Sequence, residues 1–216
     1  MKLVEHTNPE FLQNYIFFFS GTDQRKKLSF SGGTVQSRAR QDNFSVYRYE
    51  VNTRYQPLNS LSISLGVNYE ESPSKTQYVS QGDFNGIPRY ILGAIDQETL
   101  SATLRVNYNI NPNLTIQYYG QPFIFTADFS DFNYVNDAIA EDLNDRVTNY
   151  TTDQIRLENG TYGVDEDRDG AIDYSFGDPD FAFVQFRSNL VVRWEYIPGS
   201  EIFLVWSQGV TGAGDP

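Results

Sequence analysis

Apolar and polar residues alternate with a period of two along most of this chain, and this is the pattern of β-strands whose two faces differ. The clearest run, over 60–69, places serine, glycine or asparagine between apolar residues that share one face. Those apolar residues are Leu61, Ile63, Leu65, Val67 and Tyr69. The runs over 47–55 and 100–108 repeat the pattern, so the sequence predicts an all-β protein.

Counting the weaker runs as well gives about eight strands, each long enough for the roughly 9–11 tilted residues with which a strand crosses a bilayer. The predicted spans are 11–20, 26–37, 43–56, 59–71, 97–109, 113–126, 182–196 and 200–209.

The predicted connections differ in length at the two ends of the strands. Short turns occupy 56–59, 109–113 and 197–200, whereas long polar connections occupy 72–97 and 127–181. Outer-membrane barrels combine tight turns at one end with long loops at the other. We therefore predict an antiparallel, up-and-down transmembrane β-barrel. Residues 1–216 form a single barrel domain or a barrel segment with a long acidic outer loop at about 127–181. About eight strands could close a small barrel, but the abrupt ends of the chain favour a segment of a larger one.

Aromatic residues gather near the short turns, on the predicted outer face: Tyr55, Tyr108, Trp194 and Tyr196. Aromatic rings near the strand ends suit the interface between lipid headgroups and acyl chains, where barrels carry an aromatic girdle. Tyr69, at the far end of its strand, would belong to a second girdle.

Charged residues lie opposite the apolar face, within the strands: Arg48, Glu50, Arg54, Arg105, Arg187, Arg193 and Glu195. In a barrel they would point into the lumen, and in a soluble β-sandwich they would form the solvated outer face. A soluble β-sandwich that binds glycans with the help of calcium is therefore the alternative prediction.

Composition excludes several classes of function. The formal net charge of -12 argues against nucleic acid as a partner, because phosphate binding needs clustered Lys and Arg. The chain has no cysteine, which excludes disulfides and thiolate metal sites. The mean hydropathy of -0.48 and the lack of a long apolar stretch argue against a spanning helix. With His6 as the single histidine, no Ser-His-Asp triad or histidine zinc site is expected, and we predict that the chain is not an enzyme.

The acidic segment contains a motif with the spacing of a calcium loop. Asp165, Asp167, Asp169 and Asp173 follow the pattern D-x-D-x-D-G-x-x-D, in which Gly170 permits a sharp turn. Phe176 stands where a calcium-binding EF-hand has a bidentate Glu, and no helical pattern flanks the loop. Calcium bound by the four aspartates and a plain acidic turn both remain open. If calcium binds, we expect it to order the long outer loop.

Several runs resemble a known family, and they cover the chain from about 112 to 209. They are 112–117, 120–123, 173–181, 186–196, 198–200 and 203–208. They look like the end of an uncharacterised outer-membrane β-barrel domain that follows a family 9-type carbohydrate-binding domain. The resemblance implies a membrane-spanning C-terminal domain of a larger exported protein, linked to glycan handling through a domain absent from this chain.

Two departures from that family lead us to expect that the chain is a fragment. Residues 1–9 contain no apolar segment of a signal peptide, and the chain ends on 212–216 without an aromatic terminal strand. The predicted function is an outer-membrane protein that serves as anchor, pore or uptake component. Its partner would be the lipid bilayer of the outer membrane of a Gram-negative cell.

Overall fold

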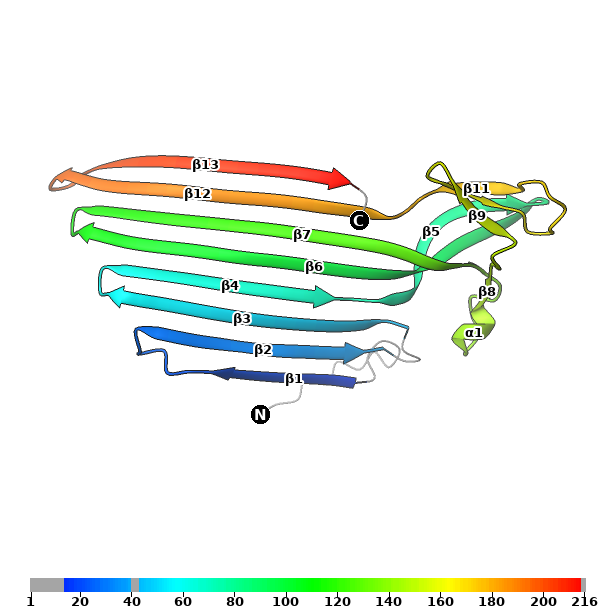
Figure 1. The fold of residues 1–216 in the computed structure, drawn as a ribbon, viewed down its shortest axis with the longest axis horizontal. Coiled ribbons are helices and arrows are strands. Elements are labelled where there is room, and N and C mark those ends of the chain that lie inside the picture. The colour runs from blue at the N-terminus through cyan, green and yellow to red at the C-terminus, as the bar shows by residue number, and fades with distance from the viewer. Residues whose placement is uncertain (1–13, 40–42, 215–216) are drawn as a thin grey trace.

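The structure of the chain, a computed structural model, describes residues 14–39 and 43–214. They form one large antiparallel sheet and a smaller three-stranded sheet, β11-β10-β9 (Figure 1). The main path of the large sheet runs β1-β2-β3-β4-β6-β7-β12-β13, while β5 pairs with β6 and β8 pairs with β7. The all-β, antiparallel prediction is confirmed. The sheet is open, with β1 and β13 at its two edges, so the predicted transmembrane barrel is not confirmed.

Each of the eight predicted strands has a counterpart on the main path. The strands are β1 (Asn14–Gly21), β2 (Leu28–Arg38), β3 (Ser45–Leu58), β4 (Leu61–Glu71), β6 (Ile87–Asn111), β7 (Leu114–Val135), β12 (Phe181–Ile197) and β13 (Ser200–Gly214). The predicted start of the first strand, at 11, lies outside the described residues. The predicted strands 97–109 and 113–126 are only parts of β6 and β7, which continue well beyond them.

Short turns join the strands at one end of the sheet, on the left in Figure 1. Between β12 and β13, Pro198 and Gly199 make the turn, and Gly199 has a φ of 79°, a value that glycine adopts without strain. Between β6 and β7, the backbone N–H of Asn113 donates to Oδ1 of Asn111 over 2.9 Å. The predicted short turns at one end are therefore present.

The opposite end carries a folded unit where the sequence analysis predicted long loops. We call residues 72–96 and 128–180 the cap. Its elements are β5 (Ser74–Phe84), the adjoining ends of β6 and β7, α1 (Leu143–Arg146), β8 (Val147–Asn149), β9 (Ile155–Glu158), β10 (Thr161–Val164) and β11 (Tyr174–Gly177). The segment 72–97 is therefore largely strand, and 127–181 contains the end of β7, four short strands and a short helix between its loops. Among the described residues, no helix is long and apolar enough to cross a membrane.

The cap has a hydrophobic core of its own, which explains why the period-two pattern fades there. Ile91, Phe132, Tyr150, Val164, Tyr174 and Phe176 are all buried in it. The three-stranded sheet packs against the long hairpin of β5 and β6, where Ile91 is buried on one face and Leu92 is half-buried on the other, so apolar residues occupy both faces. Gly82 of β5 lies against Tyr174 of β11, and a Cβ at Gly82 would come within 2.6 Å of Cδ2 of the ring. The absence of a side chain at Gly82 lets β11 dock.

Two tight hairpins of the cap depend on Asn-Gly pairs. Asn85 and Gly86 connect β5 to β6 with φ values of 54° and 81°. Asn159 and Gly160 connect β9 to β10 with φ values of 52° and 73°. Positive φ at both central residues is the geometry of a type I′ turn, which matches the twist of paired strands.

Candidate functional site

One face of the large sheet is apolar from strand to strand, and this apolar face is the main candidate site. The pairing register joins Tyr55, Ile63, Val106, Tyr118, Leu190 and Trp206 into one row across six strands. Large side chains of this face are widely exposed, including Val51 at 58% and Leu204 at 67%. Solvent-exposed apolar patches of ordinary soluble proteins cover only a few hundred Å². This face therefore needs a partner.

The aromatic residues near the short turns lie on the apolar face, as the alternation predicts. Tyr55, Tyr108 and Trp194 pair with apolar-face residues of the neighbouring strands. The rings of Trp194 and Tyr196 lie edge to face with centroids 6.0 Å apart. Toward the other end of the sheet, the rings of Tyr49 and Tyr69 stack at 6.4 Å. Aromatic pairs thus flank the aliphatic middle of the face.

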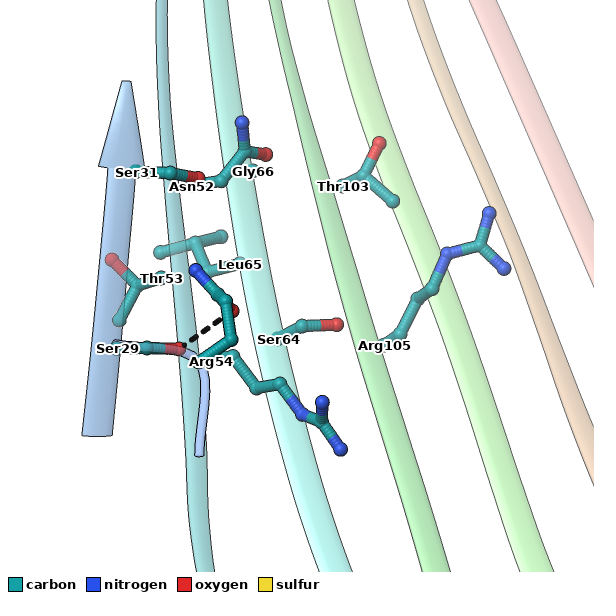
Figure 2. Close-up of a pocket in the computed structure, with 11 residues that line it drawn as sticks. Ser29, Ser31, Asn52, Thr53, Arg54, Ser64, Leu65, Gly66, Thr103 and Arg105 are labelled. Carbon is teal, nitrogen blue, oxygen red and sulfur yellow. Dashed lines mark hydrogen bonds between the residues drawn. The ribbon is translucent and has the colours of Figure 1, made fainter. Parts of the chain in front are cut away.

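The opposite face, which we call the polar face, holds all seven charged residues for which the sequence predicted a common side. Close to the short turns, a shallow hollow of about 180 Å³ opens on it between β2, β3, β4 and β6. Figure 2 shows the side chains of Arg54 and Arg105 beside serine, threonine and asparagine side chains of this hollow. Ser29 closes one side, where its Oγ donates to Oε1 of Gln24 over 3.0 Å. The hollow is therefore polar and has two cationic groups.

Several charges of the polar face are held by neighbours across the strands. Arg48 forms an ion pair with Glu70 on β4. Arg193 forms one with Glu201 on β13. The guanidinium of Arg105 lies 4.8 Å from the ring centroid of Tyr119. These contacts fix cationic side chains at defined positions on the face.

The polar face becomes aromatic next to the cap and at its edges, which the sequence analysis did not predict. Phe123 and Phe183 lie 6.1 Å apart across β7 and β12, and Phe125 and Phe181 lie 5.4 Å apart. At the β1 edge, Tyr15, Phe17 and Phe19 form a row on the same face. Alternation within one strand identifies a shared face but does not show how the rings of separate strands combine.

The predicted calcium loop brings three of its four aspartates together. Oxygen atoms of Asp165, Asp167 and Asp173 all lie within 4.8 Å of one another. Oδ2 of Asp165 accepts a hydrogen bond from the N–H of Gly170 over 2.9 Å, and Oδ2 of Asp173 accepts one from the N–H of Glu166 over 2.8 Å. Backbone donors therefore hold these carboxylates in place, and the remaining oxygen lone pairs could coordinate a hard cation such as calcium.

Asp169, the fourth predicted ligand, does not belong to this group of three. Its Oδ1 accepts from the N–H of Ala171 over 2.8 Å, so the carboxylate caps the turn that follows it. Phe176, at the position where a calcium loop has its bidentate glutamate, is 5% exposed and belongs to the cap core. The side chain there contributes to packing and cannot serve as a ligand.

Beside this loop, the cap contains a buried polar cluster to which the sequence analysis gave no role. Arg89 donates from Nε and Nη2 to Glu166, at 3.0 and 2.7 Å from Oε1. The hydroxyl of Tyr174 donates to Oε2 of Glu166 over 2.6 Å and lies 2.8 Å from the hydroxyl of Tyr150. Arg89 also lies 4.8 Å from the ring centroid of Tyr134. The cluster ties β6 to the three-stranded sheet.

Burial raises the pKa values of the two phenols in this cluster. Burial raises the pKa of Tyr150 to about 12, and burial together with the hydrogen bond to Glu166 raises the pKa of Tyr174. The hydrogen bond to Glu166 also raises the pKa of Arg89. The ion pair and the neutral phenols are therefore the favoured forms at neutral pH, as expected for structural groups.

Comparison with known proteins adds the family. A family model described as a domain of unknown function, DUF5916, matches residues 6–214. The chain belongs to this family. No curated protein and no solved structure matches this DUF5916 chain. The resemblance to an uncharacterised domain family is thus confirmed, while the carbohydrate-binding partner domain and the membrane location stay predictions. His6, the single histidine, lies outside the described residues.

Proposed function

We propose that this DUF5916 chain forms part of a β-barrel in the outer membrane of a Gram-negative cell, where it serves as anchor, pore or uptake component. The observation that carries the proposal is the continuous apolar face of a single-layered sheet. Lipid acyl chains are the partner that suits such a face, since they bury apolar side chains without requiring a complementary protein surface.

The lengths of the strands support this assignment. The strand β4 has 11 residues, β12 has 17 and β13 has 15, all sufficient for the roughly 9–11 residues that a tilted strand needs to cross the hydrocarbon core. The exposed tyrosines and Trp194 near the short turns would then lie at headgroup level.

The edges of the sheet support closure into a barrel. Unpaired N–H and C=O groups are very costly in lipid, so a sheet in the bilayer must close through β1, β13 or further strands. Both edges also carry apolar side chains on the polar face, including Phe17 at 58% and Phe203 at 57% exposed. Such residues suit contact with further protein on the inside of a barrel.

The polar face would then line the interior. Arg54, Arg105 and their serine and asparagine neighbours are compatible with water, and several of these groups would be costly to bury in a dry core. An aqueous interior favours the pore or uptake role over a simple anchor. A link to glycan handling follows from the resemblance and is part of the same proposal.

The alternative, a soluble calcium-assisted glycan-binding sandwich, requires a second sheet packed over the apolar face. In the described residues the only other sheet, β11-β10-β9, lies in the cap at one end (Figure 1). The membrane proposal is preferred because it accounts for the whole apolar face without a second layer.

Neighbouring cysteines on β4 test the proposal, since the chain has no cysteine of its own. Leu65 points to the apolar face and Ser64 to the polar face. In lipid vesicles, Leu65→Cys should react with a lipophilic maleimide and be protected from a charged one. Ser64→Cys should react with the charged reagent. Equal labelling of both variants by the charged reagent would refute burial of the apolar face in lipid.

A further inference from the structure

We propose that the cap contains a binding site for a small polyhydroxylated ligand, such as one sugar ring, in a polar pocket between β5, β6, β7, β8 and α1. The pocket has a volume of about 440 Å³. It is lined by Lys75, Thr76, Ala94, Asp131, Asn133, Asn144, Val147 and Asn149. This volume lies within the range of small-molecule sites.

The chemistry of the lining favours hydroxyl groups as the ligand. Asn133, Asn144 and Asn149 each offer an amide with donors and an acceptor, while Asp131 adds a carboxylate that only accepts. A sugar hydroxyl donates and accepts at once, so amides and a carboxylate can satisfy several hydroxyls around one ring. Ala94 and Val147 are the only apolar lining residues, which makes an apolar ligand a poor fit.

The backbone around Asp131 is shaped in a way that ordinary strand pairing does not require. Asp131 has a φ of 47°, and the register of β6 and β7 shifts by one residue between Leu92 and Ala94. Non-glycine residues at positive φ and β-bulges both concentrate at functional sites, because a bulge re-aims side chains. Here the bulge lies on the wall of the pocket.

Asn133 provides an independent observation. The residue is 4% exposed, and within the part of the chain that the structure describes its Oδ1 has no hydrogen-bond partner. Its Nδ2 donates to the backbone oxygen of Asp131 over 3.1 Å, which orients the amide beside the bulge. Buried polar atoms nearly always have a partner, so a small rotation of this amide toward the pocket on ligand binding would supply one.

Saturation-transfer difference NMR on the full chain refolded in detergent micelles tests this site. The probes are glucose, galactose, maltose and cellobiose, with glycine as a zwitterionic comparison. We expect at least one sugar to bind, with an affinity that drops about tenfold or more in Asp131→Asn and Asn149→Ala. Asparagine tolerates positive φ, so Asp131→Asn removes the charge while keeping the backbone. Asp153→Asn, an exposed substitution outside the pocket, should bind like the parent.

Two results would overturn the site. One is the absence of a sugar signal from refolded protein whose cap amides remain protected from hydrogen exchange, including the case in which only glycine binds. The other is sugar binding that both pocket variants retain at full strength. The site does not depend on the membrane proposal, because the cysteine labelling on β4 and the sugar binding can fail separately.

Discussion

Arg89 and Glu166, which lie 77 residues apart in the sequence, form a bidentate ion pair with 2.7 Å between Nη2 and Oε1. The side chains are 17% and 8% exposed, so the pair is largely shielded from water. It connects the start of β6 to the segment after β10 and holds the three-stranded sheet on the long hairpin of β5 and β6.

Glu166→Gln should destabilise the cap by about 3 kcal/mol, because breaking a buried pair leaves the guanidinium without its counter-charge. Hydrogen exchange of β9–β11 amides measures this directly, and amides of the central strands β3 and β4 should keep their protection. Arg25→Gln, which removes the exposed pair with Asp23, is the matched control and should change nothing measurable. Unchanged exchange in Glu166→Gln would show that the cap does not depend on the pair.

Gly82→Val should undock β11 from β5. A side chain at Gly82 would collide with the buried ring of Tyr174, whose displacement also removes its hydrogen bonds to Glu166 and Tyr150. The expected result is faster exchange across β9–β11 and a loss of near-ultraviolet circular dichroism from the cap. Gly177→Ala, where an added Cβ meets nothing within 4 Å, should leave both signals close to those of the parent. Full protection in Gly82→Val would contradict this packing.

Calcium binding should depend on three of the four aspartates of the loop. In isothermal titration calorimetry, Asp165→Asn and Asp173→Asn should weaken binding about tenfold or more, because each removes a charged oxygen ligand. Asp169→Asn should weaken it less, since the Asp169 carboxylate lies outside the group formed by Asp165, Asp167 and Asp173. An absence of binding heat in the parent, or equal losses in all three variants, would contradict the predicted site.

Alkaline pH should loosen the cap through Tyr150. Its pKa in the folded protein, about 12, lies above the value of about 10 for an unperturbed phenol, so the fold favours the neutral form. This contribution to stability is complete below about pH 10 and is lost as the pH rises through about 12. The difference in tyrosinate absorbance between the parent and Tyr150→Phe should show a midpoint near 12, and a midpoint near 10 would show that the phenol is not buried.

The sequence predicts the large sheet well because alternation reports burial on one side only. The strands β3 and β4 and the short turns that follow β3, β6 and β12 are visible in this way. So are the polar face, on which Arg54 lies, and the apolar face, on which Trp194 lies. The cap was not predicted because apolar residues occupy both faces of some of its strand segments and hide the alternation, as at Ile91 and Leu92. Asn85-Gly86 and Asn159-Gly160 are hairpin signals that could have located two of its turns.

The candidate sites also differ in how far the sequence predicts them, because one is formed by residues close in sequence and the other by residues far apart. The spacing of the motif predicted that Asp165, Asp167 and Asp173 lie close together, because a tight loop keeps neighbours in sequence close in space. The pair of Arg89 and Glu166 depends on the docking of β11 against β5, and no spacing in the sequence reports it. Asp169 lies outside this group of three, which the spacing of the motif alone does not show, and its role as a calcium ligand stays a prediction.

The two tryptophans of the chain test whether the apolar face is buried in lipid. Trp194 lies next to the short turn, and Trp206 lies farther along the sheet on the same face, each 51% exposed. Trp194→Phe and Trp206→Phe isolate one fluorophore each in vesicles of lipids brominated near the headgroup or near the bilayer centre.

If the apolar face lies in lipid, bromine near the headgroup should quench Trp194 more strongly, and bromine near the bilayer centre should quench Trp206 more strongly. Both residues should be protected from iodide in the water. Free quenching of both by iodide, with no effect of either brominated lipid, would contradict a membrane-embedded sheet.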